Sequence, residues 1–137
     1  YIAGMGFSNV GLGIVHSMAH PLGAFYDTPH GVANATLLPY VMEYNAESPS
    51  RAKYLDIARA MGVKTDGMSV DEGVRAAVDA VKALSLSIRI PQRLHELGVR
   101  EEDIPALAVA AFNDVCTGGN PRPTSVEEIE RLYHIAY

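Results

Sequence analysis

Two Ser-x-x-Glu pairs, each in front of an apolar stripe with helical spacing, constrain the fold of this chain most strongly. Ser69 precedes Glu72 in this pattern, and Ser125 precedes Glu128. In such a capping box the serine hydroxyl and the glutamate carboxylate bond the free N–H groups at a helix N-terminus. After Ser69 the apolar residues recur every three or four positions, which places them on one helix face: Val70, Val74, Ala77, Val78, Val81 and Leu84. We therefore predict that two helices begin directly after these serines.

The N-terminal part of the chain contains signals for two further helices. We expect Ser8 or Asn9 to cap a first helix, which ends near residues 21–23, where a proline and a glycine disturb it. We expect Asp27 or Thr28 to cap a second helix, with a proline in its first turn, where proline is favoured. The two helices would be joined by a short turn.

The remaining segments also favour helices. Apolar residues at helical spacing follow Ser50 as far as Gly62, which is suited to end a helix. The stretch "PQRLHELG" predicts a short helical turn, and Asp103 is expected to open another helix. No segment shows the sustained alternation of apolar and polar residues that marks a half-buried strand. The sequence therefore predicts an all-α domain.

Composition limits the class of protein. A chain of 137 residues with 48% hydrophobic residues is long and apolar enough for one domain with a core. The net charge of -5 argues against a nucleic-acid partner, which usually requires a basic face. No apolar run approaches the roughly 20 residues of a membrane span. Cys116 is the single cysteine, which excludes an internal disulfide and fits a reducing cytoplasm.

The opening stretch "YIAGMGFSNVGLG" contains four glycines but no dinucleotide-binding fingerprint. The spacing is not G-x-G-x-x-G, and too few residues precede Gly4 for the strand that this motif requires. We expect these glycines to let neighbouring backbones approach closely instead. The stretch also lacks an initiator methionine and the features of a signal peptide, so we expect a fragment of a longer chain.

Three of the five histidines fall within "VHSMAHPLGAFYDTPHG". His16 and His20 are four residues apart, so on a helix they share a face, and His30 could return to that face after a turn. Neutral imidazoles in apolar surroundings suit a transition metal. The alternative is that each histidine packs in the core and bonds a carbonyl group. The spacing does not decide which pair would bind the metal, nor does it supply a third ligand.

The segment "GLGIVHSMAHPLGAFYDTPHGVANATLLPYVMEYN", with its H-x3-H-x9-H spacing, resembles the C-terminal part of the iron-containing (group III) alcohol dehydrogenases. The resemblance extends over all 137 residues and includes "KYLDIARAMGV", "EDIPALA" and "DVCTGGNPR". It implies a two-domain dehydrogenase, in which a Rossmann-like N-terminal domain, absent from this chain, binds the nicotinamide cofactor. The chain would then be the helical, metal-binding domain, without its first helices.

The resemblance also implies roles for the three histidines. It makes His16 and His30 metal ligands, and it places His20 next to the nicotinamide as a cofactor contact and a candidate proton relay. The family's other two ligands, an aspartate and a histidine one helical turn apart, would lie upstream of Tyr1. The implied metal is Fe(II), although histidine and carboxylate ligands would equally accept zinc.

The resemblance places Phe7 and Cys116 at a pocket for a small substrate. Without it, Phe7 could be a core aromatic residue and Cys116 a small buried hydrophobic one. The implied reaction is the NAD(H)-linked interconversion of lactaldehyde and propane-1,2-diol, in a cytoplasmic homodimer. A related 1,3-propanediol or glycerol dehydrogenase, and a non-catalytic helical module that binds a partner, are the alternatives. We expect the 137 residues alone to have no dehydrogenase activity.

Overall fold

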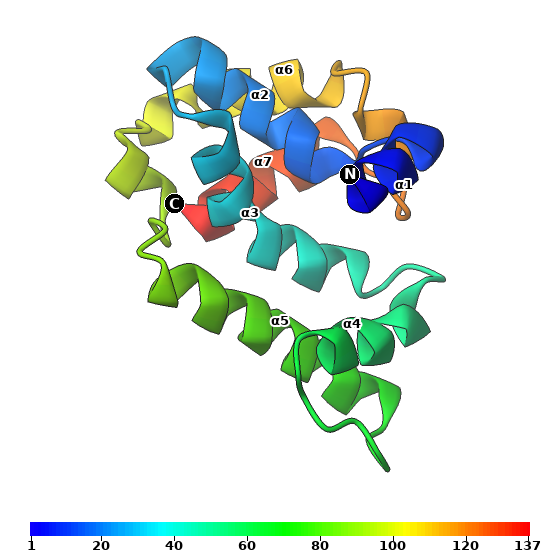
Figure 1. The fold of residues 1–137 in the computed structure, drawn as a ribbon. Coiled ribbons are helices and arrows are strands. Elements are labelled where there is room, and N and C mark those ends of the chain that lie inside the picture. The colour runs from blue at the N-terminus through cyan, green and yellow to red at the C-terminus, as the bar shows by residue number, and fades with distance from the viewer.

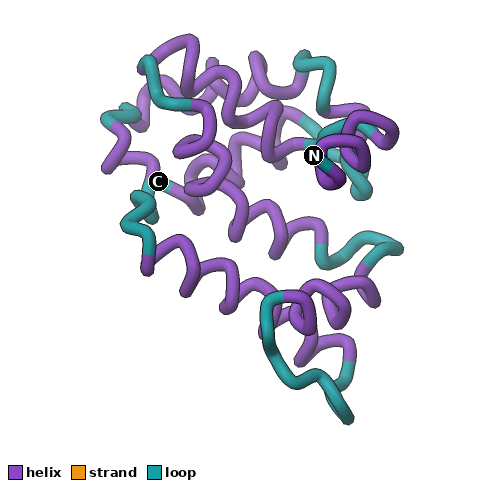
Figure 2. Tube along the Cα trace, viewed as in Figure 1, coloured by secondary structure: helices purple, strands orange, loops and turns teal.

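The structure, a computed structural model, describes all 137 residues and contains only helices and loops (Figures 1 and 2). The predicted all-α fold is therefore confirmed. No helix combines the length and the apolar composition needed to cross a bilayer. In chain order the α-helices and 3₁₀ turns are α1 (Ile2–Val10), α2 (Ile14–Tyr26), α3 (His30–Asn45), η1 (Arg51–Lys53), α4 (Tyr54–Ala60), α5 (Val70–Ser87), η2 (Leu94–Leu97), η3 (Glu101–Asp103), α6 (Ile104–Phe112), η4 (Thr117–Gly119) and α7 (Val126–Ala136).

Helix α3 joins two packed groups of helices. On one side it packs against α2 and α7, and α6 completes this group by packing against both of them. On the other side it contacts α5, which packs against α4 at the lower end of the molecule in Figure 1. The larger core lies in the first group and includes Ile14, Met18, Leu22, Leu37, Val41, Ile104, Leu107, Ile129 and Tyr133. The smaller core, between α4 and α5, contains Tyr54, Ala58, Ala77 and Val78.

The capping box predicted in front of α5 is present. The Glu72 backbone N–H donates to Ser69 Oγ over 3.3 Å, and the Ser69 backbone N–H donates to Glu72 Oε2 over 2.7 Å. Of the predicted apolar stripe, Ala77 and Val78 are buried, whereas Leu84 is 51% exposed. The stripe is therefore covered in its middle part, where α3 and α4 pack on α5, and open at its end.

The second capping box is only half formed. The Glu128 backbone N–H donates to Ser125 Oγ over 3.3 Å, as predicted. The Glu128 carboxylate, however, accepts a hydrogen bond of 2.9 Å from the Tyr44 hydroxyl and lies 3.5 Å from the Arg122 guanidinium. Through the Tyr44 contact the glutamate connects α7 with α3. A local sequence pattern does not reveal this connection.

The predicted start of the histidine-bearing helix was wrong. Ser8 and Asn9 lie inside α1, and the chain leaves that helix at Gly11, whose φ of +82° favours glycine. Helix α2 begins after Gly13, which has no side chain that could cap it. Its start is fixed by distant contacts rather than by a local cap, because Ile14 is fully buried in the larger core and its backbone N–H donates to Asn120 Oδ1 over 3.4 Å.

The predicted end of this helix was also wrong. Helix α2 continues through the buried Pro21 to Tyr26 and ends at Asp27 in a left-handed conformation (φ 52°). Asp27 therefore follows α2 and does not cap α3, which begins after Pro29 without a side-chain cap. A proline inside a helix removes one hydrogen bond, but the complete burial of Met18 and Leu22 on either side offsets this loss.

Substituting Ser69 by alanine is expected to loosen the first turn of α5. The loss of an N-cap hydroxyl costs about 1 kcal/mol, so the amides of residues 70–75 should exchange their hydrogens faster. Ser87→Ala is the matched control, because the same change at the opposite end of α5 removes only a bond to the Leu84 carbonyl. Unchanged exchange in Ser69→Ala would show that the box does not stabilise this turn.

Candidate metal centre

The structure brings the three clustered histidines together. His16 and His20 lie one turn apart on α2, and the chain returns after α2 so that His30, the first residue of α3, lies beside both of them. The centroids of the His30 and His16 rings are 5.4 Å apart, as are those of His30 and His20. The His16 and His20 centroids are 6.3 Å apart. The convergence expected from the spacing is therefore present.

These separations fit imidazoles that share one metal ion. With metal–nitrogen bonds of about 2.1 Å and a tetrahedral angle, two ligating rings have centroids roughly 5 Å apart. The pair His16 and His30 meets this condition, but so does His20 with His30. Burial lowers the pKa of His16, and the neighbouring His30 and His20 lower it further. This favours a neutral imidazole, which has a lone pair for a cation.

One nitrogen of the His30 ring already has a neighbour. Asn34 Nδ2 lies 3.1 Å from His30 Nε2 and also donates to the His30 carbonyl over 2.9 Å. The other atom of the Asn34 amide, Oδ1, is buried without a hydrogen-bond partner. A cation at His30 Nε2 would take the lone pair that faces Asn34, so the amide group would have to turn away.

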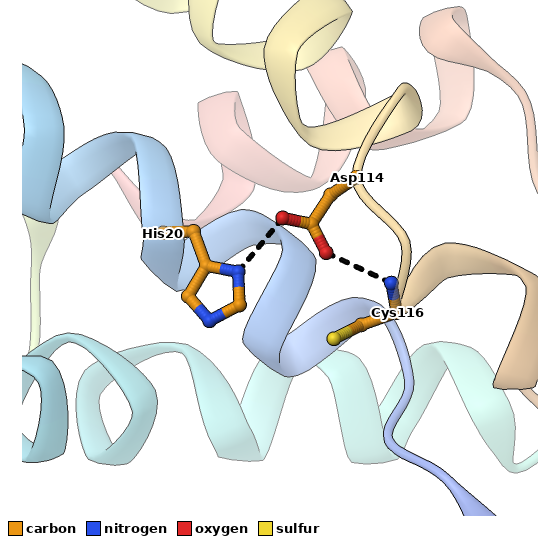
Figure 3. A group of neighbouring side chains, drawn as sticks. All are labelled: His20, Asp114 and Cys116. Carbon is orange, nitrogen blue, oxygen red and sulfur yellow. Dashed lines mark hydrogen bonds and ion pairs between the residues drawn. The ribbon is translucent and has the colours of Figure 1, made fainter.

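Asp114 pairs with His20 and is a residue that the sequence did not reveal. Its Oδ2 lies 2.7 Å from His20 Nδ1, and its Oδ1 accepts a 2.8 Å hydrogen bond from the Cys116 backbone N–H (Figure 3). Burial alone would raise the pKa of Asp114, but hydrogen bonds from Cys116 and His20 outweigh it and leave this pKa below its usual value. The carboxylate is therefore charged at neutral pH and can orient the His20 ring.

The turn that contains Asp114 is held against α2 at two points. Besides the His20–Asp114 contact, the hydroxyls of Thr117 and Ser17 are hydrogen-bonded over 2.8 Å. Ser17 and His20 are three residues apart on α2 and therefore lie on adjoining positions of one helix face. The two contacts fix the turn, and with it Cys116, relative to the histidines.

The loop that follows approaches the backbone before α2 closely. A Cβ atom on Gly119 would overlap the carbonyl oxygen of Leu12, so only glycine fits at this point. Asn120 makes a two-way amide pair with Asn45 of α3, donating over 2.8 Å and accepting over 3.0 Å. The expectation that glycines of the N-terminal segment allow close approach holds at Gly13, where a Cβ would lie 3.0 Å from Asn120 Oδ1.

Phe7 and Cys116 line the same cavity, of about 380 Å³. The other lining residues come from the same two segments: Ser8, Gly11, Leu12, Val115 and Gly119. Phe7 is 52% exposed and does not belong to either core, so it is not the core aromatic residue of the alternative interpretation. Burial, and then the hydrogen bond with Asp114 and its charge, raise the pKa of the Cys116 thiol, which favours its protonated form.

Comparison with known proteins identifies the family of this chain. The sequence profile of the Fe-containing alcohol dehydrogenase family, C-terminal part, matches residues 1–137. The chain belongs to this family. It is 66% identical over 137 residues to the lactaldehyde reductase of Escherichia coli (strain K12), and covers 36% of that protein. It is 46% identical over 136 residues to the 1,3-propanediol dehydrogenase of Citrobacter freundii, and covers 35% of it.

The solved structures of the family show the same helical fold. The alcohol dehydrogenase from Oenococcus oeni superimposes with a TM-score of 0.94 at 41% identity, over 98% of this chain and 35% of that one. A 1,3-propanediol oxidoreductase gives a TM-score of 0.89 at 44% identity, over 92% of this chain and 33% of that one. The chain thus spans about a third of the length of its relatives and corresponds to their C-terminal helical domain.

Alanine at position 119 is expected to destabilise the protein, because the loop must move away from Leu12 to make room for the methyl group. Overpacking of this kind costs about 1–3 kcal/mol, which should lower the midpoint of thermal unfolding of the full-length protein. Gly118→Ala is the matched control, since a Cβ there meets no atom within 4 Å. Equal midpoints for the two variants would contradict the close approach.

Proposed function

We propose that this chain is the metal-binding helical domain of an NAD(H)-linked oxidoreductase that interconverts lactaldehyde and propane-1,2-diol. The observation that carries the proposal is the convergence of three imidazoles beside a small cavity, in a chain 66% identical to a lactaldehyde reductase. Fe(II) is the metal that the family name supports, with zinc as an alternative of similar ligand preference.

In this proposal His16 and His30 hold the metal ion, together with an aspartate and a histidine outside these 137 residues. The 5.4 Å between their ring centroids and the depressed pKa of His16 support this assignment. When bound, the metal supplies a Lewis acid that polarises the carbonyl oxygen of the aldehyde. No third acidic, histidine or cysteine side chain of this chain forms a compact group with His16 and His30, which supports the proposal that the remaining ligands lie outside these residues.

Asp114 and His20 would act together to transfer the proton that reduction of the aldehyde requires. Because Asp114 engages Nδ1 of His20, the Nε2 atom is the one left to exchange a proton with the substrate oxygen or with a group that relays it. Reduction of the aldehyde consumes one hydride, from NADH, and one proton. Phe7 and Cys116 would line the space for a short substrate.

The rest of the proposed assembly lies outside these residues. A Rossmann-like domain of the same protein would bind most of the nicotinamide cofactor, and His20 would lie next to the nicotinamide. Helix α1 buries none of its side chains and exposes Ile2, Met5 and Val10, which supports a packing partner from that part of the protein. We further propose a cytoplasmic homodimer, as the family resemblance implies.

A 1,3-propanediol dehydrogenase is the second candidate, because the chain is 46% identical to one such enzyme. A non-catalytic helical module would share the fold but would neither bind metal nor reduce aldehydes. Purified full-length protein, loaded with Fe(II) and supplied with NADH, separates the three. The proposal expects lactaldehyde to be reduced with a higher kcat/KM than 3-hydroxypropionaldehyde. The opposite order favours the second candidate, and activity with neither substrate, in a protein that binds no metal, favours the third.

Replacing His16 by alanine is expected to reduce the bound iron of the full-length protein by at least about tenfold and to abolish turnover, because one metal ligand is lost. Metal analysis after dialysis measures the first effect without relying on activity. His95→Ala is the matched control, since His95 is exposed and lies on η2, outside the histidine cluster. Wild-type iron content in His16→Ala would refute the assignment of this ligand.

Asp114→Asn is expected to lower kcat about tenfold, with little change in KM for the aldehyde and unchanged iron content. The neutral amide is a poorer partner for His20 Nδ1, so the ring loses its fixed orientation. Asp114→Glu, which keeps the charge, should recover part of kcat. A kcat equal to that of the wild type in Asp114→Asn would show that the contact is only structural.

A further inference from the structure

A second group of metal-ligating side chains lies beside the predicted metal site and consists of different residues. His20, Asp114 and Cys116 each offer a ligand atom, and these atoms all lie within 4.8 Å of one another (Figure 3). No other three residues among the histidines, cysteines, aspartates and glutamates of this chain form such a group. The group joins α2 to the turn after α6, 94 residues further along the chain.

The donor atoms of this group select the class of cation. An imidazole nitrogen, a carboxylate oxygen and a cysteine sulfur form a mixed set that Zn²⁺ accepts, with a fourth position open to water. A sulfur ligand disfavours Mg²⁺ and Ca²⁺, which prefer oxygen ligands only. His16 and His30 themselves offer only imidazole nitrogens, so the two sites differ in the ligand atoms that this chain supplies.

The three side chains are held in place by contacts that do not depend on a metal. The Cys116 backbone N–H is bonded to Asp114 Oδ1, and the hydroxyl pair of Ser17 and Thr117 fixes the same turn on α2. The site is also open to an ion from solution, since the side chains of His20 and Asp114 are 39% and 18% exposed. Cys116 faces the cavity that Phe7 also lines.

A small movement would admit the cation. Two ligands of one Zn²⁺ ion lie roughly 3–4 Å apart, whereas His20 Nδ1 and Asp114 Oδ2 are now 2.7 Å apart and share a proton. On binding, the ion replaces this proton at Nδ1, and the neutral ring carries its proton on Nε2 instead. The Cys116 thiol loses its proton to solvent and becomes a thiolate ligand, so one proton is released for each ion bound.

We propose that His20, Asp114 and Cys116 form a second cation site for Zn²⁺ and ions of similar ligand preference, and that its occupation inhibits the enzyme. The binding part follows from the three side chains alone. The inhibition rests on the proposed function, because the ion would engage the His20–Asp114 pair and one wall of the substrate cavity at once.

Co²⁺, which takes the same ligands as Zn²⁺, allows the site to be tested by absorption. Thiolate ligation of Co²⁺ gives a charge-transfer band in the near ultraviolet, and nitrogen and oxygen ligands do not. Full-length protein titrated with Co²⁺ should develop this band, and added Zn²⁺ should remove it. The band should be absent in Cys116→Ser and unchanged in His95→Ala. In His20→Ala the apparent affinity for Co²⁺, measured from the same band, should fall at least about tenfold. A wild-type protein that binds Co²⁺ without this band, or a His20→Ala protein with full affinity, overturns the proposal.

Two further measurements separate this site from the predicted iron site. His16→Ala should retain the thiolate band although it loses iron, which places the band outside the iron site; loss of the band together with iron would overturn a separate site. In iron-loaded protein, Zn²⁺ should inhibit the wild type at a concentration at least about tenfold lower than Cys116→Ser, each measured against its own activity without zinc. Equal sensitivity of the wild type and Cys116→Ser to Zn²⁺ overturns the proposed inhibition. If neither the wild type nor any variant reduces aldehydes, the proposed function is wrong. The presence or absence of the thiolate band still tests the cation site in that case.

Discussion

The packing of α2 between α3 and α6 is the constraint on which the rest of the site depends. Ser17, Met18 and Leu22 are completely buried, so the rotation of this helix about its axis is fixed. The buried hydroxyl of Tyr133 donates to the Met18 carbonyl over 2.6 Å and connects the helix to α7. Because these positions face inward, His16 and His20 lie at the edge of the core. His30, the first residue of α3, lies beside both of them.

The turn after α6 adds a second set of groups to this edge. Its contacts with α2 use polar atoms, a carboxylate with an imidazole and one hydroxyl with another, and they lie at the margin of the apolar core. Such contacts depend on geometry more than on buried area, so they position side chains closely while contributing modest stability. Helix packing thus sets the coarse arrangement of the site, and a few hydrogen bonds set its details.

The sequence predicted what local signals encode. The serine cap of α5 and the serine half of the α7 cap follow from residues three positions apart, and the class of fold follows from periodicity. Predictions failed where distant contacts decide. Helix α2 starts at Gly13, because Ile14 is buried and its N–H is bonded by Asn120, and it runs through Pro21 because neighbouring residues are buried. Asp114 was missed for the same reason, since nothing near it in the sequence indicates that His20 is its partner. The histidine cluster itself was visible, because a spacing of four residues on a helix followed by an antiparallel return is local geometry.

The amide pair between Asn45 and Asn120 has a consequence for how this family can change. Each side chain donates one hydrogen bond to the other and accepts one in return, and Asn120 also donates to the Arg122 carbonyl. A substitution at one position removes both bonds at once. A part-buried Asn45 amide left alone has a donor and an acceptor to satisfy, whereas Asn120 keeps its bonds with the Arg122 carbonyl and the Ile14 N–H but has one N–H to satisfy. Across relatives, the two positions should therefore covary, with asparagine kept at both or exchanged at both, although 75 residues separate them in the chain.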